Sequence, residues 1–154
     1  MARALHMLDR REDSKVSAVS KLYRTPPWGK TDQSWFYNAC ARLETNLPPL
    51  QLLETCLSIE ADMKRERIER WGPRTIDIDI LVMQEKNADF ITLDEELLNL
   101  PHPRMMMRAF VLVPLADIAP YLEVEEQVIA QAAQVSDVQG IEIADSNADW
   151  WRKI

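Results

Sequence analysis

Hydrophobic positions recur along the chain with two different periods. Apolar residues spaced three and four apart over residues 1–8 and 50–64 predict two amphipathic helices. Residues 16–23 and 35–45 are rich in β-branched and aromatic side chains, which is typical of strands. Between these two runs, Thr25-Pro26-Pro27-Trp28-Gly29 predicts an irregular loop, because consecutive prolines remove backbone donors and fix φ.

The second half of the chain mixes the same two periods without a regular alternation. We predict strands over 76–83 and 89–93, short helices over 104–109 and 128–134, and an apolar segment over 110–115. Strands and helices that intermix in this way favour an α+β fold, with helices packed on a mostly antiparallel sheet. A length of 154 residues predicts a single domain, 1–154, with one core.

Composition narrows the class of protein. The net charge of −7 argues against nucleic-acid binding, because a phosphate backbone would be repelled over most of the surface. No apolar run approaches the roughly 20 residues that a membrane helix needs, and the start of the chain does not resemble a signal peptide. Cys40 and Cys56 lack metal-site spacing and are predicted to be reduced and buried. We therefore expect a cytoplasmic protein with no membrane partner.

Two carboxylates interrupt the apolar run 76–83. In an extended chain alternate side chains share a face, so Asp77 and Asp79 point the same way, about 7 Å apart, while isoleucines cover the other face. Their mutual repulsion is about 2–3 kcal/mol at an effective dielectric constant of about 20. A fold that keeps such a pair needs cations beside it.

The sequence offers two sources of positive charge for this pair. Four arginines lie directly upstream: Arg65, Arg67, Arg70 and Arg74. Mg²⁺ is the second source, because this hard ion binds one or two carboxylates and leaves its other positions to water and phosphate oxygens. We predict a magnesium site for a polyanionic ligand. The alternative is an Asp-x-Asp on the exposed face of an edge strand, paired with the arginines.

Residues 70–81, Arg-Trp-Gly-Pro-Arg-Thr-Ile-Asp-Ile-Asp-Ile-Leu, resemble the signature of the 6-hydroxymethyl-7,8-dihydropterin pyrophosphokinase family of folate biosynthesis. Further landmarks agree in order and spacing at residues 20–29, 32–33, 36–38, 101–103 and 108–115. The resemblance is clearest over residues 1–122. It implies a ferredoxin-like α+β fold and the transfer of pyrophosphate from ATP, the co-substrate, to the pterin hydroxymethyl group, with release of AMP.

The resemblance also implies roles for individual residues. Asp77 and Asp79 would hold two Mg²⁺ ions, and Arg65, Arg67 and Arg74 would act with them in catalysis. The implied ATP-binding residues are Glu60, Arg65, Arg67, Trp71, Arg74, His102 and Arg108. The implied pterin-binding residues are Thr25, Pro26, Trp28, Phe36, Asn38, Trp71 and Phe110.

Several of these side chains have a plain structural alternative. A flat heteroaromatic ring stacks favourably on Phe36 and Phe110, but single phenylalanines are more often core residues. For His102 the alternative role is to cap the next helix. For Arg108 it is that of a solvated surface charge, and for Glu60 it is to pair with Arg65.

Two other functions remain open at this point. One is a non-catalytic relative that keeps the fold and serves as a partner surface through Trp150, Trp151 and its acidic exterior; the alternative role of these two tryptophans is to pin the terminus to the body. The other is a different Mg²⁺-dependent phosphoryl or nucleotidyl transferase. The family's first strand and glycine-rich loop have no counterpart in this sequence, so we expect a chain extended upstream by about 15–20 residues to be more stable and more active.

Overall fold

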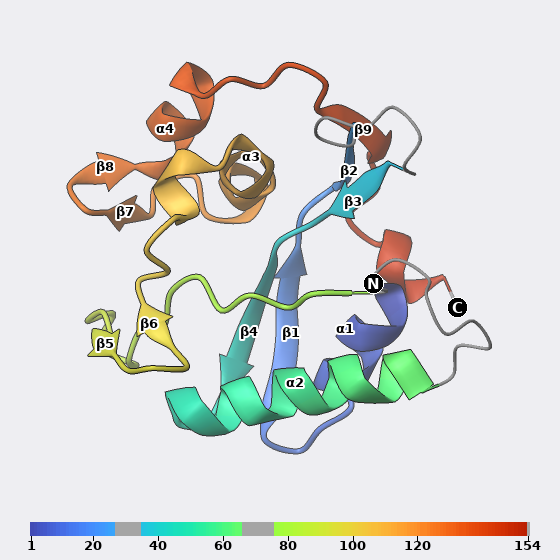
Figure 1. The fold of residues 1–154 in the computed structure, drawn as a ribbon, viewed down its shortest axis with the longest axis vertical. Helices are drawn as coiled ribbons and strands as arrows, with labels where there is room; N and C mark the ends of the chain where they lie inside the picture. The colour runs from blue at the N-terminus through green and yellow to red at the C-terminus, as the bar shows by residue number, and fades with distance from the viewer. Residues whose placement is uncertain (27–34, 66–75, 154) are drawn as a thin grey trace. The chain divides into compact units, whose positions relative to one another are not determined.

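The structure is a computed structural model that describes residues 1–26, 35–65 and 76–153. By its internal contacts the chain divides into two compact units (Figure 1). The first unit contains Met1–Lys15 and Thr45–Pro103, and the second contains Val16–Glu44 and Arg104–Lys153.

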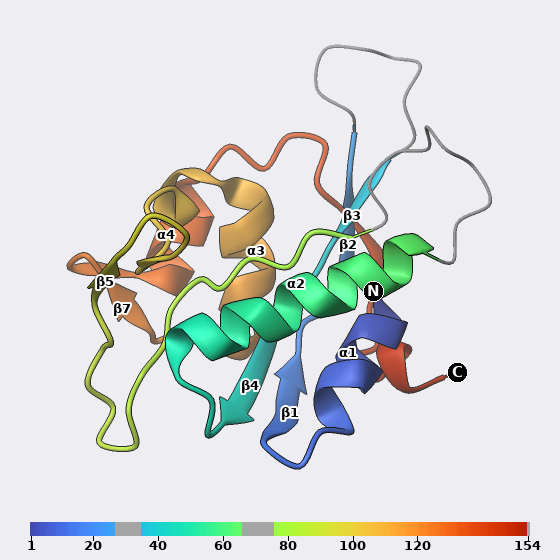
Figure 2. The same ribbon diagram turned by 60° about the horizontal axis from the view of Figure 1, so that its bottom comes forward.

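The first unit is built on two helices that contact each other, α1 (Ala2–Asp9) and α2 (Pro49–Arg65) (Figures 1 and 2). Leu52, Cys56 and Ile59 are buried at helical spacing, so one face of α2 lies in the core, and Ala4 and Leu8 do the same for α1. A short antiparallel pair, β5 (Leu93–Asp94) and β6 (Asn99–Leu100), completes this unit. The two predicted helices are confirmed.

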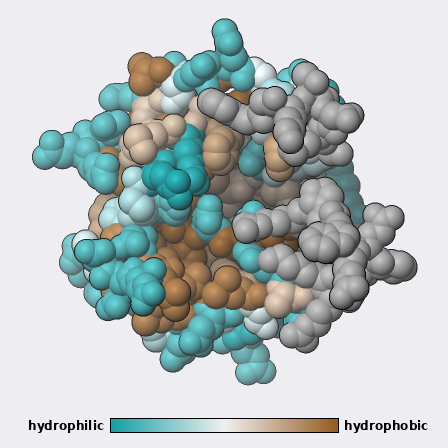
Figure 3. Space-filling view, in the orientation of Figure 1, coloured by the Kyte–Doolittle hydropathy of each residue, from teal (hydrophilic) through white to brown (hydrophobic). Residues whose placement is uncertain are grey.

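Helix α2 also carries apolar residues on its outer side. Leu50 and Leu57 are 45% and 51% exposed, and Figure 3 shows apolar atoms gathered over this helix. None of the helices in the described ranges, α2 included, is long and apolar enough to cross a membrane.

The second unit contains a three-stranded antiparallel sheet with the order β3–β2–β9. Its strands are β2 (Leu22–Thr25), β3 (Phe36–Asn38) and β9 (Glu142–Asp145). Helix α3 (Ala109–Ile118) contacts β2, β3 and α4 (Ile129–Val135). The smaller elements are η1 (Met105–Met107), β7 (Glu123–Val124), β8 (Gln127–Val128) and η2 (Trp150–Arg152). Tyr23, Leu112, Ile129 and Trp151 are among its buried residues.

Two further strands, β1 (Ser14–Val19) and β4 (Ala41–Thr45), form a separate pair. The predicted strands 16–23 and 35–45 are therefore each divided in two. Both divisions fall at one junction, where Ser20 N donates to Cys40 O at 2.9 Å and Cys40 N donates to Ser20 Oγ at 2.9 Å. Helices with antiparallel sheets confirm the α+β class.

The predicted strand over 76–83 is wrong, because the structure assigns no strand there. A strand requires a ladder of backbone hydrogen bonds to a neighbour. In the described parts of the chain this segment has isolated backbone bonds, from His102 N to Leu81 O at 2.7 Å and from Ile91 N to Met83 O at 2.9 Å.

The boundaries around α3 also differ from the prediction. The predicted helix 104–109 is a single 3₁₀ turn, and the apolar segment 110–115 lies inside α3. Val111, Leu112 and Leu115 are all buried, so α3 lacks the polar face that reveals a helix in a sequence. Its internal Pro114 further masks the pattern.

Candidate active site

The described candidate residues fall into two sets, one in each unit. Glu60, Asp77, Asp79 and His102 belong to the first unit. Thr25, Pro26, Phe36, Asn38, Arg108 and Phe110 belong to the second unit. Trp28, Arg67, Trp71 and Arg74 lie outside the described residues, and so does the side chain of Arg65, the last residue of α2.

In the first unit, the segment around the two aspartates keeps the alternation that its sequence predicts. Asp77 and Asp79 are exposed, whereas Ile76, Ile78 and Ile80 are half-buried. The carboxylates therefore reach solvent while the isoleucines lie against protein. An extended backbone accounts for this alternation even where no ladder forms.

Three contacts from other parts of the unit hold this segment. The backbone N–H of Ile78 donates to Glu60 Oε1 at 2.7 Å. At the other end, Leu81 O accepts the N–H of His102, and Met83 O accepts the N–H of Ile91. Two predicted ATP-binding residues, Glu60 and His102, are thus bonded to the segment that carries the aspartates.

The donor set of this segment suits magnesium rather than a softer ion. Carboxylate oxygens are hard ligands, and Mg²⁺ is usually held by one or two of them together with water and phosphate. Across the described ranges, no group of three or more His, Cys, Asp or Glu side chains converges as a metal site. Asp77 and Asp79 therefore fit a metal whose coordination is completed by a phosphorylated ligand.

In the second unit, the strand register places the predicted pterin residues on one face of the sheet. Thr25 pairs with Phe36, and Tyr23 pairs with Asn38, so these four side chains share a face. Asn38 Nδ2 donates to Thr25 Oγ1 at 3.2 Å, which orients the Asn38 amide. Asn38 and Thr25 thus present polar groups beside an aromatic ring.

Helix α3 supplies the second predicted aromatic residue, Phe110. Phe36 is 52% exposed and Phe110 39% exposed, so both rings are accessible to a flat ligand. The Arg108 guanidinium lies over the Phe110 ring at 5.7 Å from its centroid. The structure therefore brings a predicted ATP-binding arginine against a predicted pterin-binding ring.

Sequence reasoning missed a polar network on the same face of the sheet, centred on Asp117. Asp117 in α3 accepts three hydrogen bonds: from Tyr23 Oη at 2.8 Å, from Lys21 N at 3.1 Å and from Lys21 Nζ at 3.0 Å. Burial raises the pKa of Tyr23 above its ordinary value, and the hydrogen bond to Asp117 adds to the rise. The network ties strand β2 to helix α3. Tyr23 lies two residues before Thr25 in the same strand, and side chains two apart in a strand share a face. This spacing was the signal that could have placed Tyr23 beside the predicted site residues.

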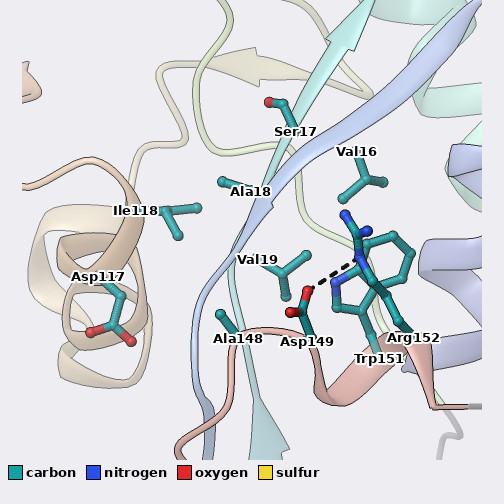
Figure 4. Close-up of a pocket in the computed structure, with 10 residues that line it drawn as sticks. All are labelled: Val16, Ser17, Ala18, Val19, Asp117, Ile118, Ala148, Asp149, Trp151 and Arg152. Atoms are coloured by element: carbon teal, nitrogen blue, oxygen red, sulfur yellow. Dashed lines mark ion pairs between the residues drawn. The ribbon is translucent and has the colours of Figure 1, made fainter.

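The second unit also contains a cavity of about 360 Å³, which holds no predicted site residue (Figure 4). It is lined by Val16, Ser17, Ala18, Val19, Asp117, Ile118, Ala148, Asp149, Trp151 and Arg152. Arg152 pairs with Asp149 at 3.3 Å and lies 5.0 Å from the centroid of the buried Trp151 ring. Asp117 is bonded to Lys21 and Tyr23. The charged groups of this cavity already have protein partners.

The two tryptophans near the C-terminus pin the chain within the second unit. Trp150 Nε1 donates to Ser20 O at 3.0 Å, and Trp151 is only 3% exposed. Of the two predicted roles for this pair, the structure favours anchoring over a contact surface.

Comparison with known proteins identifies the family. Residues 1–120 match the sequence model of the 7,8-dihydro-6-hydroxymethylpterin-pyrophosphokinase (HPPK) family. The chain is 50% identical over 128 residues to the 2-amino-4-hydroxy-6-hydroxymethyldihydropteridine pyrophosphokinase of Methylorubrum extorquens, covering 83% of this chain and 78% of the relative.

Two further proteins of the same name match this chain at lower identity. The Pseudomonas aeruginosa protein is 46% identical over 123 residues, which cover 80% of this chain and 73% of the relative. The Bacillus subtilis protein is 38% identical over 143 residues, which cover 93% and 80%. Together with the match over residues 1–120, these identities show that the chain belongs to the 7,8-dihydro-6-hydroxymethylpterin-pyrophosphokinase family.

Proposed function

We propose that this chain transfers pyrophosphate from ATP to the hydroxymethyl group of 6-hydroxymethyl-7,8-dihydropterin, in folate biosynthesis. The observation that carries the proposal is the family match over residues 1–120, which includes the exposed pair Asp77 and Asp79. In this reaction the hydroxymethyl oxygen attacks the β-phosphorus of ATP. The bond from that phosphorus to the α,β-bridging oxygen breaks, AMP leaves, and the hydroxyl proton is released.

The aspartates of the first unit are assigned to the phosphate end of the reaction. In this proposal Asp77 and Asp79 hold two Mg²⁺ ions, which would neutralise the phosphate chain when bound. Arg65, Arg67 and Arg74 contribute positive charge to the transferred group. Their place in the sequence, directly before the aspartates, supports this assignment.

The remaining nucleotide roles follow the same logic. Trp71, His102 and Arg108 are assigned to ATP, and the family resemblance implies the same role for Glu60. The backbone bond of His102 to Leu81 supports its assignment, because it places His102 beside the segment that carries the aspartates.

The sheet face of the second unit is assigned to the pterin. Phe36 and Phe110 provide accessible rings for stacking, and Asn38 offers donor and acceptor groups that suit a pterin amide. Thr25 orients Asn38. Pro26, Trp28 and Trp71 complete the proposed pocket.

Three broader predictions belong to the same proposal. The α+β fold is of the ferredoxin-like type, the chain 1–154 forms a single domain, and the protein works in the cytoplasm. The antiparallel pairing of the described strands supports the first of these. Buried free thiols at Cys40 and Cys56 fit a reducing compartment.

The family match disfavours the two other functions. A different phosphoryl transferase would release ADP from ATP, and a nucleotidyl transferase would release pyrophosphate and leave an adenylylated product, so neither would release AMP. One experiment separates all three functions: incubation of the protein with ATP, Mg²⁺ and 6-hydroxymethyl-7,8-dihydropterin, followed by chromatography of the nucleotides. We expect pterin-dependent AMP. ADP, or no turnover, would refute the proposal.

A further inference from the structure

The side chain of Glu60 is bonded to the backbone between the two aspartates. Its Oε1 accepts the N–H of Ile78 at 2.7 Å, and Ile78 lies directly between Asp77 and Asp79 in the sequence. We infer that Glu60 is a positioning residue of the metal site, which fixes the backbone from which both carboxylates project. This inference rests on the proposed function, because it takes the aspartates to be the metal ligands.

Other described bonds of this segment lie further from the aspartates. Leu81 O accepts the N–H of His102 and Met83 O accepts the N–H of Ile91, two and four residues beyond Asp79. The bond from Ile78 to Glu60 lies one residue from each aspartate. It is therefore the described contact best placed to set the direction of both carboxylates.

Glu60 is itself held by a rigid element. It lies in α2, one residue after the buried Ile59 and four after the buried Cys56. A site built on a helix is held more precisely than one built on a loop. The acceptor is a carboxylate, and bonds to charged acceptors are about twice as strong as those between neutral groups.

Coordination of the metal by Glu60 itself does not fit the structure. In the part of the chain that the structure describes, Glu60 does not converge with Asp77 and Asp79 as a three-carboxylate metal site. Its role is therefore exerted on the backbone of the ligand segment. Groups that hydrogen-bond to metal-ligating side chains typically contribute about 10- to 100-fold to metal affinity, and we expect an effect of the lower end of this range from a bond to the adjoining backbone.

The competing role is the direct contact with ATP that the family resemblance implies. The two roles change different quantities. A direct contact would raise the KM for ATP and leave unchanged the Mg²⁺ concentration that the reaction requires at saturating ATP. A positioning role would raise that Mg²⁺ concentration, together with faster hydrogen exchange at the Ile78 amide once the bond to Glu60 is lost.

The test compares Glu60→Ala, Glu60→Gln and the control Glu54→Ala, which removes an exposed carboxylate from the same helix. The first measurement is hydrogen exchange of the Ile78 amide by NMR, without nucleotide. The second is the Mg²⁺ dependence of AMP release at saturating ATP and pterin. Glu60→Gln keeps an oxygen that can accept the Ile78 N–H, so it separates loss of the bond from loss of the charge.

For Glu60→Ala we expect Ile78 exchange to accelerate and the half-saturating Mg²⁺ concentration to rise, each about tenfold or more. Glu60→Gln should give values between those of the parent and of Glu60→Ala on both measures, because a neutral amide oxygen still accepts the bond but more weakly than a carboxylate. Glu54→Ala should match the parent. If Glu60→Ala does not fold, Glu60→Met replaces it, since it keeps the apolar stem without an oxygen.

Unchanged Ile78 exchange in Glu60→Ala, or a raised KM for ATP with an unchanged Mg²⁺ requirement, would overturn the inference. Failure of the proposed function has a different signature. In that case the parent protein makes no AMP, or Asp77→Ala keeps full activity, while the Ile78 exchange still reports on the bond to Glu60.

Discussion

Replacement of Tyr23 by Phe tests whether its network with Asp117 stabilises the second unit. The substitution removes one hydroxyl from a side chain that is 6% exposed and leaves the ring in place. The lost bond joins Tyr23 Oη to Asp117 Oδ2 at 2.8 Å. Hydrogen bonds to charged groups contribute about 1.5–3 kcal/mol to stability.

The neighbours of Asp117 reduce the expected cost. Its carboxylate keeps two bonds from Lys21 and is 19% exposed, so water replaces part of what Tyr23 supplied. We therefore expect Tyr23→Phe to lower the free energy of unfolding by about 1–2 kcal/mol. For a domain of this size that corresponds to a fall in Tm of roughly 2–8 °C.

The assay is thermal and guanidinium unfolding followed by circular dichroism. Tyr37→Phe is the matched control, because Tyr37 pairs with Arg24 on the opposite face of the sheet and is 53% exposed. It should unfold like the parent. If Tyr23→Phe also unfolds within about 0.5 kcal/mol of the parent, the network contributes nothing measurable and the reasoning is refuted.

The same bond predicts a pH dependence. Burial and Asp117 raise the pKa of Tyr23 above its ordinary 10.0, so the unfolded chain loses this proton at a lower pH than the folded chain does. The stability that neutral Tyr23 provides is complete below the unfolded pKa and falls as the pH rises beyond it. The parent should therefore lose stability above that pH more steeply than Tyr23→Phe, and equal slopes would contradict the assignment.

Three further predictions address the site and its surroundings. Asp77→Ala should lower AMP release at least about a hundredfold with the fold retained, because charge stabilisation at the phosphates is lost. The control Asp94→Ala, which removes another exposed carboxylate, should leave AMP release unchanged, and near-normal turnover in Asp77→Ala would remove the metal assignment. Gly140 has φ +78°, and a Cβ there would meet Pro26 Cγ at 2.7 Å. Gly140→Ala should therefore lower Tm and, by displacing Pro26 in the proposed pocket, raise the KM for the pterin; an unchanged KM would exclude Pro26 from the pocket. Burial raises the pKa of Cys40 to about 12, so this thiol should resist alkylation at pH about 8 until the chain is unfolded, and rapid labelling of the native protein would contradict its burial.

The features predicted best from the sequence are those that a periodic pattern of apolar and polar residues marks directly. The face of α2 formed by Leu52, Cys56 and Ile59 follows from spacing alone, because a helix with one buried face shows that face in its sequence. The exposure of Asp77 and Asp79 likewise follows from alternation with isoleucines.

The missed features depend on contacts between residues distant in sequence. The division of the strands at Ser20 and Cys40 is fixed by bonds across 20 residues, and the network of Tyr23 with Asp117 by a bond across 94. No local pattern encodes such pairings. The position of Glu60 against Ile78 is of the same kind, since the two are 18 residues apart.

The third strand of the sheet in the second unit lies beyond the part of the chain that the family model matches. The match ends at residue 120, yet β9 pairs with β2 through Tyr23 and Arg24, and Trp150 donates to Ser20 just before β2. A fragment designed to the limits of the match would therefore leave one edge of β2 open and its preceding turn unanchored. For dissection of this protein, the segment after residue 120 should be treated as part of the scaffold of the sheet face that is proposed to bind the pterin.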